Sequence, residues 1–341
     1  MLELVEYESF KYFKEIKNFL RRKKAYLFLD EEFINNLINN YKAKFYFILS
    51  FDINNKINGI LFFYINENFK RKKIGYTFFD SFIFDEKKIA ENIILEIENF
   101  ISKNSISAFY INSTNNLDKI LNDLKKNYII NIHPNNNNLN WDNKPGVFRT
   151  EVRKAIKRGF NIITNQNFPS IKYYNLYLAN QLKKNIPIHN KKFFFELLKM
   201  KSTVIFSCEK EGVLAGYALI GLDNDKAHLL FSNISKENLS HGVNQLIFWE
   251  VIQFLSKKSI NNLILGPSNP NGNTAFFKKK IGGIEFDFYQ HHISLNKYKN
   301  NINSQNSNKK NKSIKSMIIK FLPKFILLYI LKHKRIYGKI F

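Results

Sequence analysis

The order of strand and helix patterns occurs twice along the chain, and this repetition limits the folds that the chain can adopt. Apolar runs rich in β-branched and aromatic residues alternate with amphipathic segments of helical period in the order β-α-α-β-β-β-α-β-α-β. The order runs through residues 1–134 and again through residues 159–297, without a repeat of the amino-acid identities. A mixed order of this kind implies an α/β sheet with helices on both faces. We therefore predict two tandem domains of the same α/β class.

The first half begins with two capped helices and continues into a meander of hairpins. Ser9 is expected to cap the helix in FKYFKEIKNFL, and Asp30 the helix in EEFINNLINNY. Three β-prone runs follow with short polar turns between them, so most neighbouring strands are expected to be antiparallel. The remaining predicted elements are a helix over Asp85–Lys103, a strand in SAFYIN, a helix over Asn116–Lys126 and a strand in YIINI.

The stretch Ala227–Gly283 organises the second half. Its predicted elements are a strand over Ala227–Ser235, a buried helix over Gln245–Leu255, a short strand over Asn262–Gly266 and a basic helix. Thr274 is expected to cap the basic helix, and Gly282–Gly283 to end it. Another helix is predicted over Arg149–Arg158, ahead of the repeated order.

Two polar segments divide the chain. We expect an N-terminal domain over residues 1–134, a linker over 135–148 and a C-terminal domain over 149–297. Residues 298–312 are polar and of low complexity, which is typical of a linker. Residues 313–341 mix apolar residues with Lys and Arg. Such a segment can lie on an anionic membrane surface or pack back onto the domain as a helix, and the sequence leaves both interpretations open.

The net charge of +25 is typical of proteins that bind polyanionic partners. Residues 299–341 hold eleven Lys and Arg and no Asp or Glu, which leaves +14 for the rest of the chain. A charge of this size favours nucleic acid, anionic lipid or phosphorylated substrates, and it is also typical of a soluble protein from a lysine-rich proteome. No DNA partner is expected.

The composition argues against other classes of protein. Glu3, Glu6 and Glu8 stand where a signal peptide needs positive charge, and no run of about 18 apolar residues predicts a transmembrane helix. The single cysteine, Cys208, excludes an internal disulfide framework and is expected to be a buried structural thiol. No metal-ligand motif occurs, so no metal site is predicted. We expect a cytoplasmic protein, with peripheral association at the inner face of the plasma membrane as an option.

Six segments between Arg149 and Gly283 resemble the acyltransferase domain of the FemA/FemB-like group. In chain order they are RTEVRKAIKRGF, NIPIHNKKFFFELL, EGVLAGYALI, NQLIFWEVI, LILGPSN and FFKKKIGG. This group consists of tandem members of the GNAT superfamily, with relatives named BioF2-like acetyltransferases. The resemblance implies two GNAT-like domains and transfer of an acyl or aminoacyl group to a primary amine. The peptidoglycan members take an aminoacyl group from aminoacyl-tRNA and attach it to the peptide of a lipid-linked or nucleotide-linked cell-wall precursor.

The resemblance also implies a role for Lys278. The Phe-Lys pair of the family motif corresponds to Phe277–Lys278, and the family lysine is implicated in handling the charged donor at the reaction centre. This chain has Ile281 where the family usually has an aromatic residue, which changes the shape of the pocket. Taken alone, a cluster of lysines at 278–280 is more typical of a solvated helix face.

The donor is expected where two strands of a GNAT-like sheet diverge. Those strands end near Ser232–Ser235 and Gly266–Ser268, where freed backbone N–H groups can hold a developing oxyanion. The predicted substrate-binding residues there are Phe277, Ser232, Asn233, Asn244, Gly266 and Ser268. The helix start at Ser240–Asn244 has one glycine and no Lys or Arg, which argues against the pyrophosphate of acyl-CoA. We expect no tightly bound cofactor, and a donor that is aminoacyl-tRNA or, as the alternative, acyl-CoA.

Further residues are candidates for contacts to the two substrates. Arg149, Arg153 and Lys157 form a helical stripe suited to phosphates, although a solvated face has the same pattern. Lys184 and His189 flank an extended segment that we expect near the acceptor. The general base stays open among Glu250, His241, His189 and Asp287.

Three functions therefore stay open. The first is a FemAB-like transferase that forms an amide on a cell-envelope precursor, without a covalent enzyme intermediate. The second is an acyl-CoA-dependent N-acyltransferase of an amino sugar or another amine. The third, from another class, is a protein without catalytic activity that binds RNA or a membrane surface on the same fold.

Overall fold

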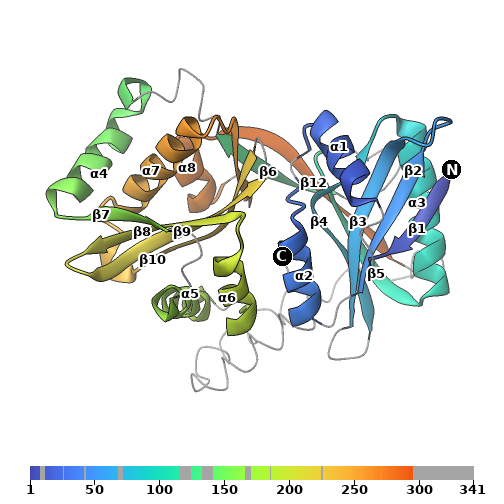
Figure 1. The fold of residues 1–341 in the computed structure, drawn as a ribbon, viewed down its shortest axis with the longest axis horizontal. Helices are drawn as coiled ribbons and strands as arrows, with labels where there is room; N and C mark the ends of the chain where they lie inside the picture. The colour runs from blue at the N-terminus through green and yellow to red at the C-terminus, as the bar shows by residue number, and fades with distance from the viewer. Residues whose placement is uncertain are drawn as a thin grey trace, which may run out of the picture.

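A computed structural model gives the fold (Figure 1) and describes residues 1–7, 12–25, 27–41, 44–67, 72–115, 124–132, 141–165, 170–184, 186–223, 226–269 and 271–294. The elements of the first half are β1 (Leu2–Glu6), α1 (Phe13–Arg22), α2 (Glu31–Asn40), β2 (Lys44–Phe51), β3 (Ile57–Glu67), β4 (Lys73–Phe84), α3 (Lys87–Lys103), β5 (Ile106–Ser113) and β6 (Leu124–Ile132). These follow the predicted order through β5.

The second half opens with η2 (Trp141–Asn143) and α4 (Gly146–Lys157). It continues with β7 (Asn161–Asn165), α5 (Ile171–Lys184), α6 (Lys191–Lys199), β8 (Thr203–Lys210), β9 (Val213–Asp223), β10 (Lys226–Ile234), η3 (Lys236–Asn238), α7 (Val243–Lys257), β11 (Asn262–Ser268), α8 (Asn273–Lys280) and β12 (Ile284–Ser294). The predicted order of the second half is confirmed element by element.

The strands form one continuous twelve-stranded sheet in the order β1-β2-β3-β4-β5-β12-β6-β11-β10-β9-β8-β7. Its neighbours are antiparallel except for the pairs β4–β5 and β10–β11, which are parallel. The expectation of a mixed, mostly antiparallel sheet is therefore confirmed. The halves also exchange strands at the centre of the sheet: β12 from the second half pairs with β5, and β6 from the first half pairs with β11 (Figure 1).

Helices cover both faces of this sheet, as predicted. In the second half α7 packs on β8, β9 and β10 with α4 against it, and α5 and α6 lie on the opposite face (Figure 1). In the first half α3 packs on β2, β3 and β5. The helix α2 of the first half packs on α6 of the second, and one core cluster includes Phe33, Phe62, Phe193 and Tyr217. The two halves therefore share an apolar core.

Two helix-end predictions are confirmed. The carboxylate of Asp30 accepts a hydrogen bond from the backbone N–H of Phe33 at 2.9 Å, which caps α2. At the end of α8, Gly282 has φ +100° and the N–H of Gly283 donates to the carbonyl of Lys278 at 3.0 Å. This left-handed glycine ends the helix.

Some of the predicted elements differ from the structure. Helix α8 begins at Asn273 rather than after Thr274, because a turn at Asn269 places Gly272 at the N-cap. Helix α4 begins at Gly146, behind Pro145, and not at Arg149. The predicted helix over 116–126 is a strand from Leu124 onward, because pairing with β12 overrides the local pattern.

Several predictions fall outside the described residues. They are the cap Ser9, residues 116–123 of the predicted helix, and both C-terminal segments, 298–312 and 313–341. The domain boundaries stay predictions.

Candidate functional site

The strands β10 and β11 separate in the middle of the second half. Their parallel pairing covers three positions and ends with His228 opposite Ile264. Beyond this point β10 continues along β9 to Ile234, with a bulge between Leu229 and Phe231, whereas β11 continues along β6 to Ser268. A bulge bends a strand and increases its twist, so it turns β10 away from β11. The predicted divergence is therefore present.

Lys278 reaches this divergence from α8. Its side chain is only 6 % exposed, and it lies on the same helix face as the buried residues Ala275 and Ile281. The Nζ atom donates to the hydroxyl of Ser268 at 2.8 Å and to the carbonyl of Gly266 at 3.0 Å. Lys279 and Lys280 are exposed, and they contact Glu285 and the Phe276 ring. Lys278 thus differs from its neighbours, and a solvated lysine cluster does not describe it.

Burial lowers the pKa of Lys278 to about 8. The hydrogen-bond partners of its Nζ are the neutral oxygens of Gly266, Pro267 and Ser268, at 2.8–3.5 Å. Desolvation disfavours an ammonium ion, and neutral oxygens offset this less than a carboxylate does. Lys278 can therefore exchange a proton near neutral pH, or stabilise negative charge while it is protonated.

Gly266 sets the direction of its own carbonyl. It has φ +76°, and the register of β11 against β6 shifts between Ile264 and Pro267. A Cβ on Gly266 would meet no atom within 4 Å, so only the backbone conformation requires glycine here. The irregular strand end turns the Gly266 carbonyl toward Lys278, which places the lysine at the point where the strands part.

An apolar hollow of about 290 Å³ lies beside the same strand end. Gly266 and Pro267 form part of its wall, together with His228 and Leu230 of β10. The other side is built from the first half, including Leu27, Phe28 and Phe33. Sequence reasoning missed this hollow, because its walls come from residues about 200 positions apart that meet only where the two halves pack.

The start of α7 is covered by α4. Gly242 has φ +78° at the N-cap, and a Cβ there would lie 2.0 Å from the carbonyl oxygen of Glu151. The Nζ of Lys154 donates to the carbonyl of Ser240 at 2.8 Å. Asn244, a predicted contact residue, is half-buried in the first turn of α7. Helix α4 therefore packs against the turn that precedes α7, and it brings the side chain of Lys154 to that turn.

The remaining predicted contact residues lie in different surroundings. Ser232 is exposed on β10, and Phe277 packs against Phe248 of α7. Asn233 is buried; it donates to the Tyr217 hydroxyl at 3.0 Å and accepts from Asn180 at 3.2 Å. The asparagine therefore ties β10 to β9 and α5, which is a structural role.

The structure does not bring His189 and Lys184 to the hollow. His189 is 1 % exposed in the core between the halves, hydrogen-bonded to the Tyr41 hydroxyl and stacked on Phe193. Lys184 is exposed at the end of α5. Their predicted place near an acceptor stays a prediction.

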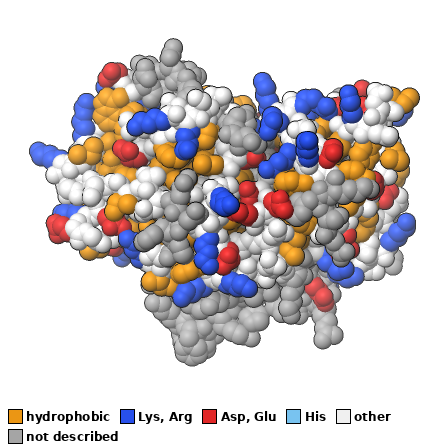
Figure 2. All heavy atoms as spheres, viewed as in Figure 1, with side chains coloured by type: hydrophobic (Ala, Val, Ile, Leu, Met, Phe, Trp, Pro, Cys, Tyr) orange, Lys and Arg blue, Asp and Glu red, His pale blue; other side chains and the backbone are white. Residues whose placement is uncertain are grey.

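The basic stripe lies on α4, away from the hollow. Arg149 is half-buried and 3.8 Å from Asp142, the Arg153 guanidinium lies over the Trp141 ring, and Lys157 is exposed. On the face shown in Figure 2, Lys and Arg side chains are scattered among apolar ones and do not gather in one patch. A role in binding phosphates stays a prediction.

The candidate bases remain separate as well. Burial raises the pKa of Glu250 on α7. The Nδ1 of His241 contacts Asn238 at 3.1 Å, and Asp287 accepts from the Tyr289 hydroxyl at 3.2 Å. None of these contacts involves Lys278, so the base stays open.

The corresponding place in the first half is closed by hydrogen bonds. The parallel pairing of β4 and β5 ends with Tyr76 opposite Tyr110. Beyond it, the side-chain amide of Asn112 donates to the Thr77 carbonyl at 2.9 Å, and Thr114 donates to the Asp80 carboxylate at 2.7 Å. These bonds cross from β5 to β4. Phe78 and Asn112 line the same hollow from the first half, whereas the second half brings the buried Lys278 to its strand end. The second half is the better candidate for chemistry.

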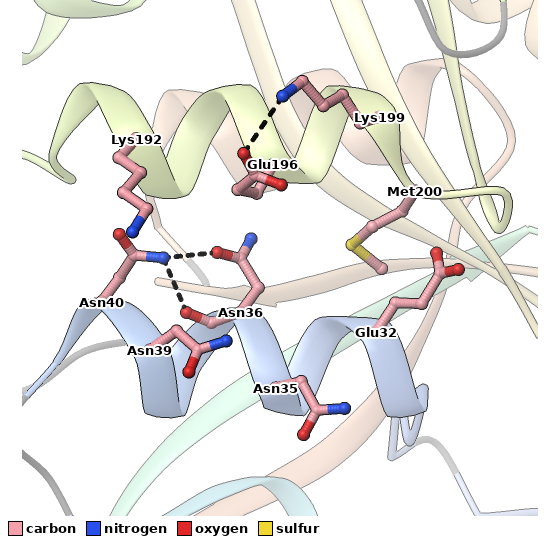
Figure 3. Close-up of a pocket in the computed structure, with 9 residues that line it drawn as sticks. All are labelled: Glu32, Asn35, Asn36, Asn39, Asn40, Lys192, Glu196, Lys199 and Met200. Carbon is pink, nitrogen blue, oxygen red and sulfur yellow. Dashed lines mark hydrogen bonds and ion pairs between the residues drawn. The ribbon is translucent and has the colours of Figure 1, made fainter.

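A second, polar hollow of about 620 Å³ lies between α2 and α6 (Figure 3). Asn36 and Asn40 of α2 face Lys192 and Glu196 of α6 across it, and Asn36 donates to the Phe193 carbonyl at 3.0 Å. No predicted site residue lines this hollow.

The described part of the chain shows neither a cluster of metal ligands nor a membrane-spanning helix. Among these residues, no three His, Cys, Asp or Glu side chains are grouped so that they could hold a metal ion. No described helix combines the length and apolar character needed to cross a membrane. Cys208 is buried, and burial raises the pKa of its thiol to about 12, which confirms the prediction of an inert structural thiol.

Comparison with solved structures finds this fold elsewhere, at low sequence identity. FemX matches with a TM-score of 0.64 and 12 % identity, over 87 % of this chain and 98 % of FemX. A tandem GNAT protein from the clavulanic acid biosynthesis pathway matches with a TM-score of 0.55 and 9 % identity, over 86 % and 98 %. The C-terminal domain of a protein named as a lysylphosphatidylglycerol synthetase in Agrobacterium fabrum matches with a TM-score of 0.52 and 12 % identity. The match covers 81 % of this chain and 89 % of that domain.

Sequence comparisons give no such match. No protein-family model matches the chain, and no match is found among curated proteins. At identities of 9–12 % the structural likeness concerns the fold alone. The chain therefore has the tandem GNAT-like fold of FemX, and the resemblance seen in its sequence is confirmed at the level of the fold.

Proposed function

We propose that this chain is an acyltransferase that moves an aminoacyl group from a charged tRNA to a primary amine of a lipid-linked or nucleotide-linked cell-envelope precursor. The observation that carries the proposal is the position of Lys278. Its ammonium group is buried where β10 and β11 diverge, held by Ser268 and Gly266, beside a hollow that a substrate group can enter. A buried lysine with a lowered pKa at an open strand end marks a candidate functional site.

The reaction requires one bond to form and one to break. The amine nitrogen attacks the ester carbonyl carbon of the aminoacyl-tRNA, and the C–O bond to the ribose breaks. The electron pair leaves with the ribose oxygen, which receives a proton, while the amine loses one. The barrier falls when the carbonyl oxygen, which becomes negative during the attack, is stabilised and the two substrates are held in line.

Lys278 and Ser268 are placed to supply that stabilisation. The Ser268 oxygen accepts a hydrogen bond from Nζ, so its own O–H hydrogen points to another acceptor. We assign that hydrogen to the carbonyl oxygen of the donor, with the charge of Lys278 behind it. An ammonium ion in a desolvated site stabilises nearby negative charge more strongly than one in water does.

The donor follows from the start of α7. In this chain α4 covers that helix end through Glu151 and Lys154, and the turn carries no Lys or Arg between Glu237 and Glu250. The lack of Lys and Arg in the turn itself disfavours the pyrophosphate of acyl-CoA, while Lys154 of α4 supplies one positive charge beside it. The likeness to FemX, and to a domain whose name describes synthesis of an aminoacylated lipid, supports aminoacyl transfer.

The first experiment measures transfer by Lys278 variants. Lys278→Met keeps an apolar side chain of similar length without the charge, and it is expected to lower transfer about 100- to 1,000-fold. The matched control is Lys280→Ala, an exposed lysine on the same helix, which should change transfer less than twofold. Thermal unfolding must show that both variants fold. A folded Lys278→Met protein that keeps its transfer rate would exclude the proposed centre.

The second experiment identifies the donor. The purified protein is titrated with acetyl-CoA and, separately, with charged and uncharged tRNA at two salt concentrations. We expect salt-sensitive binding of tRNA, because phosphate contacts weaken steeply with salt, and no binding of acetyl-CoA. Micromolar binding of acetyl-CoA would instead assign the acyl-CoA-dependent reaction.

A further inference from the structure

The hollow beside Gly266 is apolar on most of its surface. Phe28 and Phe33 from the first half, Leu230 of β10, Ile264 and Pro267 of β11, and Phe288 of β12 all line it. Its volume of about 290 Å³ exceeds the space of one water molecule many times over. Apolar walls with few polar groups are typical of sites that bind the apolar part of a small molecule.

Two polar side chains reach this hollow, and they differ in their hydrogen bonding. The amide of Asn112 is used within the protein: its nitrogen donates to the Thr77 carbonyl at 2.9 Å, and its oxygen accepts from Gln290 at 2.9 Å. His228 is 5 % exposed, and its Nε2 has no hydrogen-bond partner among the described residues. A buried polar atom without a partner costs free energy unless water or a bound group supplies the bond.

His228 is neutral in these surroundings. Burial, and next to it the charge of Lys226, lower its pKa to about 3. The imidazole packs against the Phe28 ring with a centroid distance of 5.1 Å. Nε2 of a neutral imidazole either donates or accepts one hydrogen bond, depending on the tautomer. A bound group therefore needs one polar atom next to an apolar body.

Gly266 and Pro267 connect the hollow to Lys278, which does not itself line the hollow. The Gly266 carbonyl accepts from Lys278, while Gly266 and Pro267 line the hollow. The pairing of β10 with β11 ends at His228 and Ile264, and both residues line the hollow as well. A group seated there would therefore lie across the Gly266–Pro267 backbone from Lys278.

We propose that this hollow binds the side chain of the transferred aminoacyl group, that this side chain is branched aliphatic or aromatic, and that His228 pairs with the α-amino group next to it. The proposal rests on the proposed function for the identity of the donor. Leucyl, isoleucyl and phenylalanyl groups fit the apolar walls, whereas glycyl leaves them empty and lysyl would bury a charge. Each missing methylene lowers the binding affinity roughly 10-fold or more. The affinity for a leucyl group should therefore exceed that for a glycyl group by at least about 100-fold.

The binding test uses amino-acid amides, which contain no tRNA and do not react. Phenylalaninamide, leucinamide and glycinamide are titrated by calorimetry against the full-length protein. We expect the two apolar amides to bind and glycinamide to bind at least about 100-fold more weakly. Equal affinity of the three amides, or binding of none, would overturn the proposal.

Variants locate the binding. Ile264→Phe fills the hollow and should weaken leucinamide at least tenfold, whereas Ile284→Phe makes the same change at an exposed position of β12 and should have no effect. His228→Leu removes Nε2 at similar volume and should weaken both apolar amides about tenfold. If Ile264→Phe does not fold, Leu230→Phe fills the same space from β10. Unchanged leucinamide affinity in folded variants of Ile264 or Leu230 contradicts the proposal.

Transfer assays separate this proposal from the proposed function. Leucyl-tRNA, phenylalanyl-tRNA, glycyl-tRNA and lysyl-tRNA are compared as donors, with Lys278→Met as the inactive reference. If transfer depends on Lys278 but is equally fast with all four donors, the proposed function stands and the proposed side-chain specificity is wrong. If the apolar amides bind, Ile264→Phe weakens their binding, and no donor supports transfer, the hollow is a ligand site but the proposed function is wrong.

Discussion

The Nζ atom of Lys278 lies 2.8 Å from the hydroxyl oxygen of Ser268, although the lysine belongs to α8 and the serine to the end of β11. Both side chains are buried, at 6 % and 7 % exposure. The serine therefore receives a hydrogen bond from a desolvated ammonium group and directs its own hydrogen elsewhere. This pair joins the helix that carries the charge to the strand end where the sheet opens.

Removal of the serine hydroxyl should impair the pair without removing the charge. Ser268→Ala is expected to lower transfer about 10- to 100-fold, because one donor to the developing oxyanion is lost. It should also lower the pKa of Lys278 further, since the ammonium form loses an acceptor. Ser256→Ala, an exposed serine on α7, is the matched control. If Ser268→Ala transfers at the wild-type rate, Ser268 has no role in the mechanism.

The pH dependence of stability should report Lys278 directly. Its pKa is about 8 in the folded protein and 10.5 in the unfolded chain, so between these values the unfolded state binds more protons. Stability conferred by the wild-type residue therefore rises with pH across this window and is constant below about pH 8. The shift corresponds to about 3 kcal/mol.

Chemical denaturation of wild type and Lys278→Met at pH 7 to 11 measures this effect. The difference in unfolding free energy cancels the other titrating groups, including the second buried lysine, Lys144. The unfolding free energy of the wild type should rise relative to that of the variant as pH rises above about 8. The transfer rate of the wild type should fall over the same range, because the ammonium group loses its proton. A difference that is independent of pH would mean that Lys278 titrates normally.

Two glycines test the close approach of α4 to the start of α7. Gly242 and Gly212 have almost the same φ, +78° and +77°, but a Cβ on Gly242 lies 2.0 Å from the Glu151 carbonyl, whereas a Cβ on Gly212 meets nothing within 4 Å. Gly212→Ala should cost about 1 kcal/mol, for the backbone conformation alone. Gly242→Ala should cost at least about 3 kcal/mol, since α4 has to move as well. Equal losses in thermal unfolding would show that the contact with α4 is loose.

The stripe on α4 makes a separate prediction for tRNA. If Arg153 and Lys157 contact phosphates, replacing each with alanine should reduce the slope of log affinity against log salt by about 0.7 to 0.9. Lys87→Ala, which removes an exposed lysine paired with Glu91 on α3, should leave the slope unchanged. Identical slopes for all three variants would assign the stripe to a solvated helix face.

The fold was largely predictable from the sequence, because hydrophobic period and turn residues act locally. Asp30, Gly282 and the order of strands and helices were found in this way. The exchange of β6 and β12 was not predictable, because both strands read as ordinary β-prone runs and only their long-range pairing distinguishes them. The strand that begins at Leu124 shows the same limit, since it was expected to lie in a helix.

The candidate site was predictable only where a motif marks it. Lys278, Gly266 and Ser268 were expected from the resemblance, and the structure brings them together. His228 was missed, because a single histidine in an apolar strand carries no signal until Phe28 from the other half covers it. Conversely, His189 was expected near the acceptor because it lies in an extended segment, yet it is buried in the core between the halves.

The exchange of β6 and β12 also affects how the chain is made. During synthesis the first half leaves the ribosome with β5 as an unprotected edge, because its second neighbour, β12, is among the last strands to be translated. An open edge strand pairs readily with other chains. Because β6 is translated before β12, it is available to pair with this edge earlier. Neither half contains all the native neighbours of its own strands, so we expect two pieces made by a cut in the linker to depend on each other for folding.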